Sequence, residues 1–205
     1  MRGTVGRVCG AGLVVGVLVA GLTACTGGAG GDGKAEACTN GTYAWSGVRR
    51  TQKLTAMSDP LLFEKVTASY SAELKPVDDR VYRPSVTGAP RGVRAAAVIT
   101  ALGRHLKVEE PLAGPSEREV AQEDHFFEIA TGDLKGAYYA WGYVRLVEAD
   151  FTYTCAGGER ATGRVRTWEG TGSGFLPCSE SSDDTAGRLA ARRTCPAGSA
   201  AAQGA

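Results

Sequence analysis

The sequence predicts a mainly β protein, either an antiparallel β-sandwich or a curved sheet with one packed helix, with an α+β arrangement as the alternative. Apolar residues alternate with polar ones through residues 139–155 and again through residues 42–56, a pattern typical of half-buried strands. In residues 94–107 the apolar residues recur every three or four positions, as on one face of a helix. The strand of residues 139–155 is the longest and is therefore expected to be central.

The first 24 residues have the charged-then-apolar order of a secretory signal. Arg2 and Arg7 precede the uncharged residues 8–24, whose glycines and alanines make the run too weak for a membrane-spanning helix of ~20 apolar residues. The run ends in Leu22-Thr23-Ala24-Cys25, and these four residues resemble the lipobox of bacterial lipoproteins. The sequence therefore predicts a lipoprotein signal peptide over residues 1–24.

The lipobox resemblance implies that cleavage leaves Cys25 as the first residue and that its thiol carries a diacylglyceryl group. Two or more acyl chains anchor a protein stably. The expected partner is therefore the membrane, reached through the lipid on Cys25, and the expected location is the extracellular face of the cell membrane. An ordinary signal peptide with an accidental cysteine is the alternative interpretation.

The chain after the signal divides into a tether, a domain and a tail. Residues 25–37 are rich in Gly and Ala, the composition of a flexible tether. A β-rich globular domain is expected over residues 38–178, and a polar, Ala-rich tail over residues 179–205. After residue 24 the chain carries 21 basic and 22 acidic side chains, a balance that argues against nucleic acid as a partner.

The remaining elements of the domain follow from periodicity and turn signals. In the first strand the alternation changes parity at Gly47, which predicts a bulge. We expect one half-buried strand over residues 62–74 and a short edge strand or irregular crossing over 78–90. A loop is expected over 109–124, in which Ser116-x-x-Glu119 caps at most one helical turn, and a strand over 125–130. In the tail we expect a short helix over 183–193, capped by Ser182, and disorder in the last residues.

The hairpin that follows the central strand has a testable register. Opposed residues of equal parity require a loop of odd length, and Ala156–Gly158 supplies one with Gly at its final, left-handed position. This loop places Asp150 opposite Arg164 and Glu148 opposite Arg166. Two carboxylates on one strand face can act as an acid/base pair in glycoside hydrolysis. Cross-strand ion pairs on the solvent face are the favoured interpretation.

Four cysteines remain once Cys9 has left with the signal and Cys25 has taken the lipid, and an even number in an exported chain predicts two disulfides. A four-thiolate metal site is the alternative, but no C-x-x-C spacing occurs. Cys155 and Cys178 lie far apart along the hairpin, so their pairing is excluded. The sequence favours pairing of Cys38 with Cys155 and of Cys178 with Cys195.

The search for catalytic chemistry finds no motif. His105 and His125 are the only histidines, and neither has the spacing of a ligand or nucleophile pair. Gly170–Gly174 (GTGSG) matches neither a nucleophile elbow nor a P-loop and predicts a bulged loop. No cofactor or metal is expected. Alternating aromatic residues either line a groove or, as we favour, form the core: Tyr43, Trp45, Tyr138, Tyr139, Trp141 and Tyr143.

Three stretches carry a second resemblance: CTNGTYAWSGV at residues 38–48, F-x-Y-x-C at 151–155, and T-W-E at 167–169 ahead of G-x-G-F-L-P-C at 172–178. With them the mature part resembles uncharacterised surface lipoproteins of high-GC Gram-positive bacteria, a resemblance that implies no activity. We therefore expect a lipid-anchored cell-surface protein with a binding or structural role. An extracellular or cell-wall hydrolase is the alternative, although the sequence favours a protein that is not an enzyme.

Overall fold

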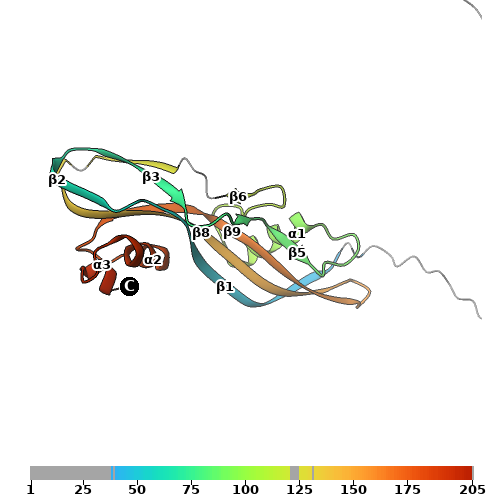
Figure 1. The fold of residues 1–205 in the computed structure, drawn as a ribbon. Coiled ribbons are helices and arrows are strands. Elements are labelled where there is room, and N and C mark those ends of the chain that lie inside the picture. Colours follow the sequence, from blue (N-terminus) through green and yellow to red (C-terminus); the bar gives the residue numbers. More distant parts are fainter. Residues whose placement is uncertain (1–37, 39, 121–124, 131, 205) are drawn as a thin grey trace, which may run out of the picture. The chain divides into compact units, whose positions relative to one another are not determined.

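A long antiparallel hairpin forms the centre of the fold in the computed structural model, which describes residues 38, 40–120, 125–130 and 132–204 (Figure 1). Its strands are β8 (Leu134–Thr154) and β9 (Arg160–Pro177). The predicted register is confirmed, since Asp150 opposes Arg164 and Glu148 opposes Arg166. The turn closes with hydrogen bonds from the Cys155 N–H to the Glu159 carbonyl and from the Gly158 N–H to the Cys155 carbonyl. Gly158 has the expected left-handed backbone, with φ of 87°.

Seven of the described strands form one antiparallel sheet around this hairpin, which confirms the mainly β fold class and favours the curved sheet over the sandwich. The order is β5-β9-β8-β1-β3-β7, and β2 pairs with the first residues of β8. The strands that flank the hairpin are β1 (Thr42–Met57), β2 (Leu61–Thr67), β3 (Tyr70–Pro76), β5 (Ser85–Thr87) and β7 (His125–Ile129). Because β8 pairs on both edges, it is the central strand, as predicted.

Bulges bend the strands that flank β8. The β1–β8 register shifts between Ser46 and Arg49, around Gly47 with φ of 58°, as the parity change predicts. A second β1 shift lies between Leu54 and Ala56. The β8–β9 register shifts opposite Arg145. At these three shifts the extra residue lies on β1 or β9 and not on β8. We call the two sides of β8 the odd face and the even face after their residue numbers.

Two helices cover separate halves of the odd face. Helix α1 (Ala95–Leu106) is the predicted amphipathic helix, and it ends at Lys107 in a left-handed cap. Its residues Val98 and Leu102 are fully buried in a cluster with Phe151 and Tyr153 near the end of β8. Helix α2 (Thr185–Thr194) packs its alanines against Tyr139 and other residues near the start of β8. The single packed helix that the sequence predicts is therefore joined by others.

The C-terminal helices correct two expectations. The cap of α2 is Asp184, whose carboxylate accepts a hydrogen bond from the Gly187 N–H at 2.6 Å, whereas Ser182 supports Asp184 through its hydroxyl. The end of the chain forms α3 (Ala200–Gln203), so the prediction of disorder is wrong for these residues. Ala201 is fully buried, and its N–H donates to the Cys178 carbonyl. Packing therefore orders residues 200–203, which the composition of the tail alone predicts to be disordered.

The expected single strand over residues 62–74 is two strands. The chain reverses between β2 and β3, and the Ala68 carbonyl there accepts a hydrogen bond from the Gly132 N–H. The strands bury opposite parities, because Phe63 is buried on β2 and Leu74 on β3, whereas Val66 is 65% exposed. The even-numbered alternation therefore runs through a turn that has no Gly or Pro to mark it.

The GTGSG segment is strand rather than the predicted loop, because β9 continues through it to Pro177. Aromatic rings of β8 lie across these glycines. A Cβ atom at Gly172 would lie 2.6 Å from the Tyr143 ring, and one at Gly174 would lie 2.2 Å from the Trp141 ring. Because the opposing ring fills the space of a side chain, only glycine fits at these two positions. The GTGSG sequence therefore reflects close packing between β8 and β9 and not a loop.

The even face is covered over only part of its length. Leu74 of β3 packs on Ala140, and Tyr82 packs on Val144 and Leu146. Tyr82 belongs to a two-stranded ribbon of β4 (Val81–Tyr82) and β6 (Glu119–Val120), which stands where one helical turn was expected. Beyond Leu146 the even-numbered residues of β8 are partly exposed. This uncovered sheet face is the natural place to look for a site.

Candidate binding surface

The cysteines lie as the sequence predicts. Cys38 is bonded to Cys155 and Cys178 to Cys195, with Cα atoms 5.6 Å apart in each pair. The first bond joins the residues ahead of β1 to the end of β8, and the second joins the end of β9 to the C-cap of α2. Cys25, the residue predicted to carry the lipid, lies outside the described residues. Among those described, no helix has the length and hydropathy to cross a bilayer.

The two carboxylates on the uncovered face are neutralised by arginines. Arg164 Nε donates to Asp150 Oδ1 at 2.8 Å, and Arg166 Nε lies 2.8 Å from Glu148 Oε1. Arg49 contacts Glu148 from the other side at 3.4 Å. The hydrogen bond from Arg164 lowers the pKa of Asp150, so this carboxylate stays charged. A general acid for glycoside hydrolysis needs a raised pKa, so the shift at Asp150 is opposite to the one required.

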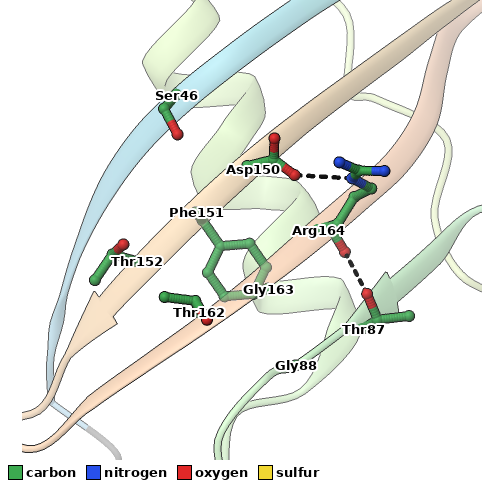
Figure 2. A pocket seen from close by; sticks show the side chains of 9 residues that line it. All are labelled: Ser46, Thr87, Gly88, Asp150, Phe151, Thr152, Thr162, Gly163 and Arg164. Carbon is green, nitrogen blue, oxygen red and sulfur yellow. Dashed lines mark hydrogen bonds and ion pairs between the residues drawn. The ribbon is translucent and has the colours of Figure 1, made fainter.

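A shallow hollow of about 510 Å³ opens beside this ion pair (Figure 2). Hydroxyl groups from four strands surround it: Ser46, Thr87, Thr152 and Thr162. Figure 2 shows Asp150 and Arg164 side by side, with Thr87 next to the backbone of Arg164, whose carbonyl accepts a hydrogen bond from the Thr87 hydroxyl at 3.5 Å. The hollow has a mixed polar and apolar lining, is open to solvent and is built mainly on four strands.

Two glycines shape the hollow. A Cβ atom at Gly163 would lie 2.2 Å from the Thr87 carbonyl oxygen and 2.4 Å from the ring of Phe151. Gly88 has a φ of 72°, and a Cβ there would lie 2.1 Å from the Thr162 carbonyl oxygen. These contacts bring β5 close to β9, and the ring of Phe151 fills the space that a side chain at position 163 would need. No motif in the sequence marks either glycine.

A second hollow, of about 460 Å³, lies on the odd face beside the C-terminal end of α1. Arg145 is exposed there, and Arg50 Nε binds Glu169 Oε1 at 2.7 Å. Glu109 and Glu110 line its other side, after the end of α1. The sequence carries a signal for this site, because Arg145 is the one charged residue among the odd-numbered residues of 139–155. Both basic and acidic side chains therefore line this hollow.

The aromatic residues are mainly core, as the sequence favours. Tyr139 and Trp141 are buried, and their rings stack with centroids 5.0 Å apart. Tyr43 and Trp45 are half-buried and also stack, with centroids 5.2 Å apart. They line neither hollow.

The histidines do not share a site. His105 of α1 stacks on Trp45 with centroids 6.0 Å apart, and His125 is the first residue of β7. In the described ranges no three His, Cys, Asp or Glu side chains come together in a way that would hold a metal ion.

Comparison with protein-family models, with curated proteins and with solved structures yields no match in any of the three. The interpretation of this chain therefore rests on its own residues and geometry.

Proposed function

We propose that this chain is a lipid-anchored binding protein on the extracellular face of the cell membrane. The lipobox-like sequence that ends in Cys25 and the Gly- and Ala-rich composition of residues 25–37 support the anchor. The hydroxyl-lined hollow on the uncovered sheet face supports the binding role. Its hydroxyls, together with the Asp150–Arg164 pair, offer several hydrogen-bond donors and acceptors on a rigid, open surface, which suits an extended polar ligand.

The alternative of an extracellular or cell-wall hydrolase has less support. Such an enzyme needs a carboxyl that is protonated near neutral pH, or a nucleophile beside a base. Glu148 and Asp150 are bound by arginines instead, and the hollow beside them is open. We therefore assign these two residues to the structure and polarity of the surface.

The anchor is tested by metabolic labelling with a palmitate analogue. Wild-type protein is expected to take up the label and to remain in the membrane fraction, whereas Cys25→Ser is expected to lose the label and leave that fraction. Equal labelling of both proteins would refute the anchor.

The binding role is tested with glycan and peptide arrays, using the mature chain with Cys25→Ser. Thr152→Val with Thr162→Val removes two hydroxyls from the hollow while keeping the side-chain shape. The matched control is Thr51→Val with Thr100→Val, two exposed threonines that do not line the hollow. A ligand of the hollow should be retained by the control and lost by the first variant, and equal retention by both would place binding elsewhere.

A further inference from the structure

Three segments meet at the end of β8 where the tether enters the domain. The Cys38 N–H donates to the Arg91 carbonyl at 3.1 Å, and Cys38 is bonded to Cys155 beside the hairpin turn. Ala89 and Val93 pack against the same core cluster as Cys38 and Cys155. The loop of residues 88–94, the residues ahead of β1 and the β8–β9 turn therefore form one surface, which we call the tether-end surface.

The tether-end surface is basic. Arg91, Arg94 and Arg160 are exposed, and across the described part of the chain none of the three forms an ion pair. Glu159 of the turn is the acidic residue beside them. Helix α1 also begins here. The side chain of its N-cap residue, Arg94, makes no capping hydrogen bond, and the first turn of the helix has no acidic residue. The partial positive charge of the helix end therefore adds to that of the arginines.

The other end of β8 has the opposite balance. Strand β2 pairs with the first residues of β8, and β3 follows it directly. Residues 58–80, which contain both strands and the loops beside them, carry five acidic and three basic side chains. The two ends of the central strand therefore differ in charge, and an anionic surface would attract the tether end and repel the β2–β3 end.

We infer that the tether-end surface docks on anionic phospholipid headgroups of the membrane that holds the anchor. This inference rests on the proposed lipid anchor. A Gly-rich chain of thirteen residues, the number between the expected lipid site and Cys38, has a typical end-to-end distance of about 20 Å, a length that would keep the domain close enough for frequent contact. Charges are screened beyond about 8 to 10 Å, so attraction acts once the arginines reach the surface. Docking directs the β2–β3 end away from the lipid.

The test is co-sedimentation of the mature chain carrying Cys25→Ser with vesicles, so that binding does not depend on the lipid. The protein with its three arginines unchanged is expected to bind phosphatidylglycerol-containing vesicles at least tenfold more strongly than phosphatidylcholine vesicles. Each arginine near an anionic surface contributes about fivefold in affinity. Arg91→Gln with Arg94→Gln and Arg160→Gln should therefore lower binding to the anionic vesicles by more than tenfold, and the same three changes to Lys should preserve it.

The matched control, Lys65→Gln with Arg80→Gln and Arg192→Gln, removes the same net charge from exposed positions elsewhere and should change binding less than about threefold. Equal losses in both Gln variants, or wild-type binding that does not weaken as salt rises from about 0.1 to 0.5 M, would overturn the docking surface. A failure of palmitate labelling at Cys25 would instead refute the anchor alone, because the vesicle assay uses protein without lipid.

Discussion

Gly174 lies directly opposite Trp141 in the β8–β9 ladder, and the indole ring occupies the space that a side chain at position 174 would need. Trp141 is buried. A Cβ atom added at Gly187 of α2 would also lie 2.6 Å from the Trp141 ring. The ring is thus held between a strand glycine and a helix glycine. This arrangement sets how closely α2 approaches the sheet.

Gly174→Ala is therefore expected to destabilise the fold by about 1–3 kcal/mol, the usual cost of overpacking a core. Denaturant unfolding followed by tryptophan fluorescence measures the change. Gly157→Ala in the hairpin turn is the control, because nothing lies within 4 Å of a Cβ there. Equal stability of Gly174→Ala and the control would contradict the packing of Trp141.

The helix cap of α2 gives a second prediction. Asp184→Ala removes the carboxylate that binds the Gly187 N–H, and the expected loss is about 0.5–2 kcal/mol. Asp183→Ala is the matched control, since Asp183 is exposed and contributes only its carbonyl to Arg188. Thermal unfolding of both variants separates the effect of the cap from a general effect of charge. A larger loss of stability in Asp183→Ala than in Asp184→Ala would contradict the assignment of Asp184 as the cap.

The two disulfides should differ in their contributions to stability. In the chain-entropy model a bond that closes a longer loop stabilises more, which gives about 5 kcal/mol for Cys38–Cys155 and about 3 kcal/mol for Cys178–Cys195. Their sequence separations are 117 and 17 residues. Paired Cys→Ala variants, compared by denaturant unfolding, measure both. The order of the two losses is the test, and a larger loss for the shorter loop would show that local packing outweighs loop entropy.

The Asp150–Arg164 pair predicts a dependence of stability on acid pH. The folded pKa of Asp150 is lowered from 3.8, chiefly by the hydrogen bond from Arg164. The pair therefore stabilises the fold fully above the unfolded pKa, and this contribution disappears as pH falls through the lower folded value. In Asp150→Asn the free energy of unfolding should therefore fall less between pH 5 and pH 2 than it does in the wild type. An NMR titration that finds the Asp150 pKa at or above 3.8 would contradict the assignment.

The hairpin register was predictable because polarity along both strands fixes parity, and one glycine fixes the turn. Asp150 and Glu148 face arginines in that register, whereas the register of a two-residue turn would set Asp150 against Val165 and Glu148 against Thr167. The disulfide pairing followed from the same geometry. Local pattern was enough wherever cross-strand neighbours carry matching chemistry.

Other features depend on contacts that the sequence does not mark. The turn between β2 and β3 contains neither Gly nor Pro, so the alternation in the sequence is continuous through residues 62–74. The glycines of GTGSG predict a loop by composition, whereas the rings on β8 require them within a strand. The hydroxyl-lined hollow combines residues from β1, β5, β8 and β9, and only the final sheet order brings Ser46 and Thr87 to the same place.

The bond between Cys38 and Cys155 also determines how the domain responds to mechanical load on its N-terminal segment. Without it, tension at residue 38 would peel β1 from β8 one residue pair at a time, beginning at Thr42 and Thr154. With it, the load passes through a covalent bond to the end of the central strand, so that peeling from this end is blocked. Rupture would then require β8 to slide against its neighbours, which breaks many hydrogen bonds together. Reduction of this one bond should therefore convert a load-bearing domain into one that unzips at low force.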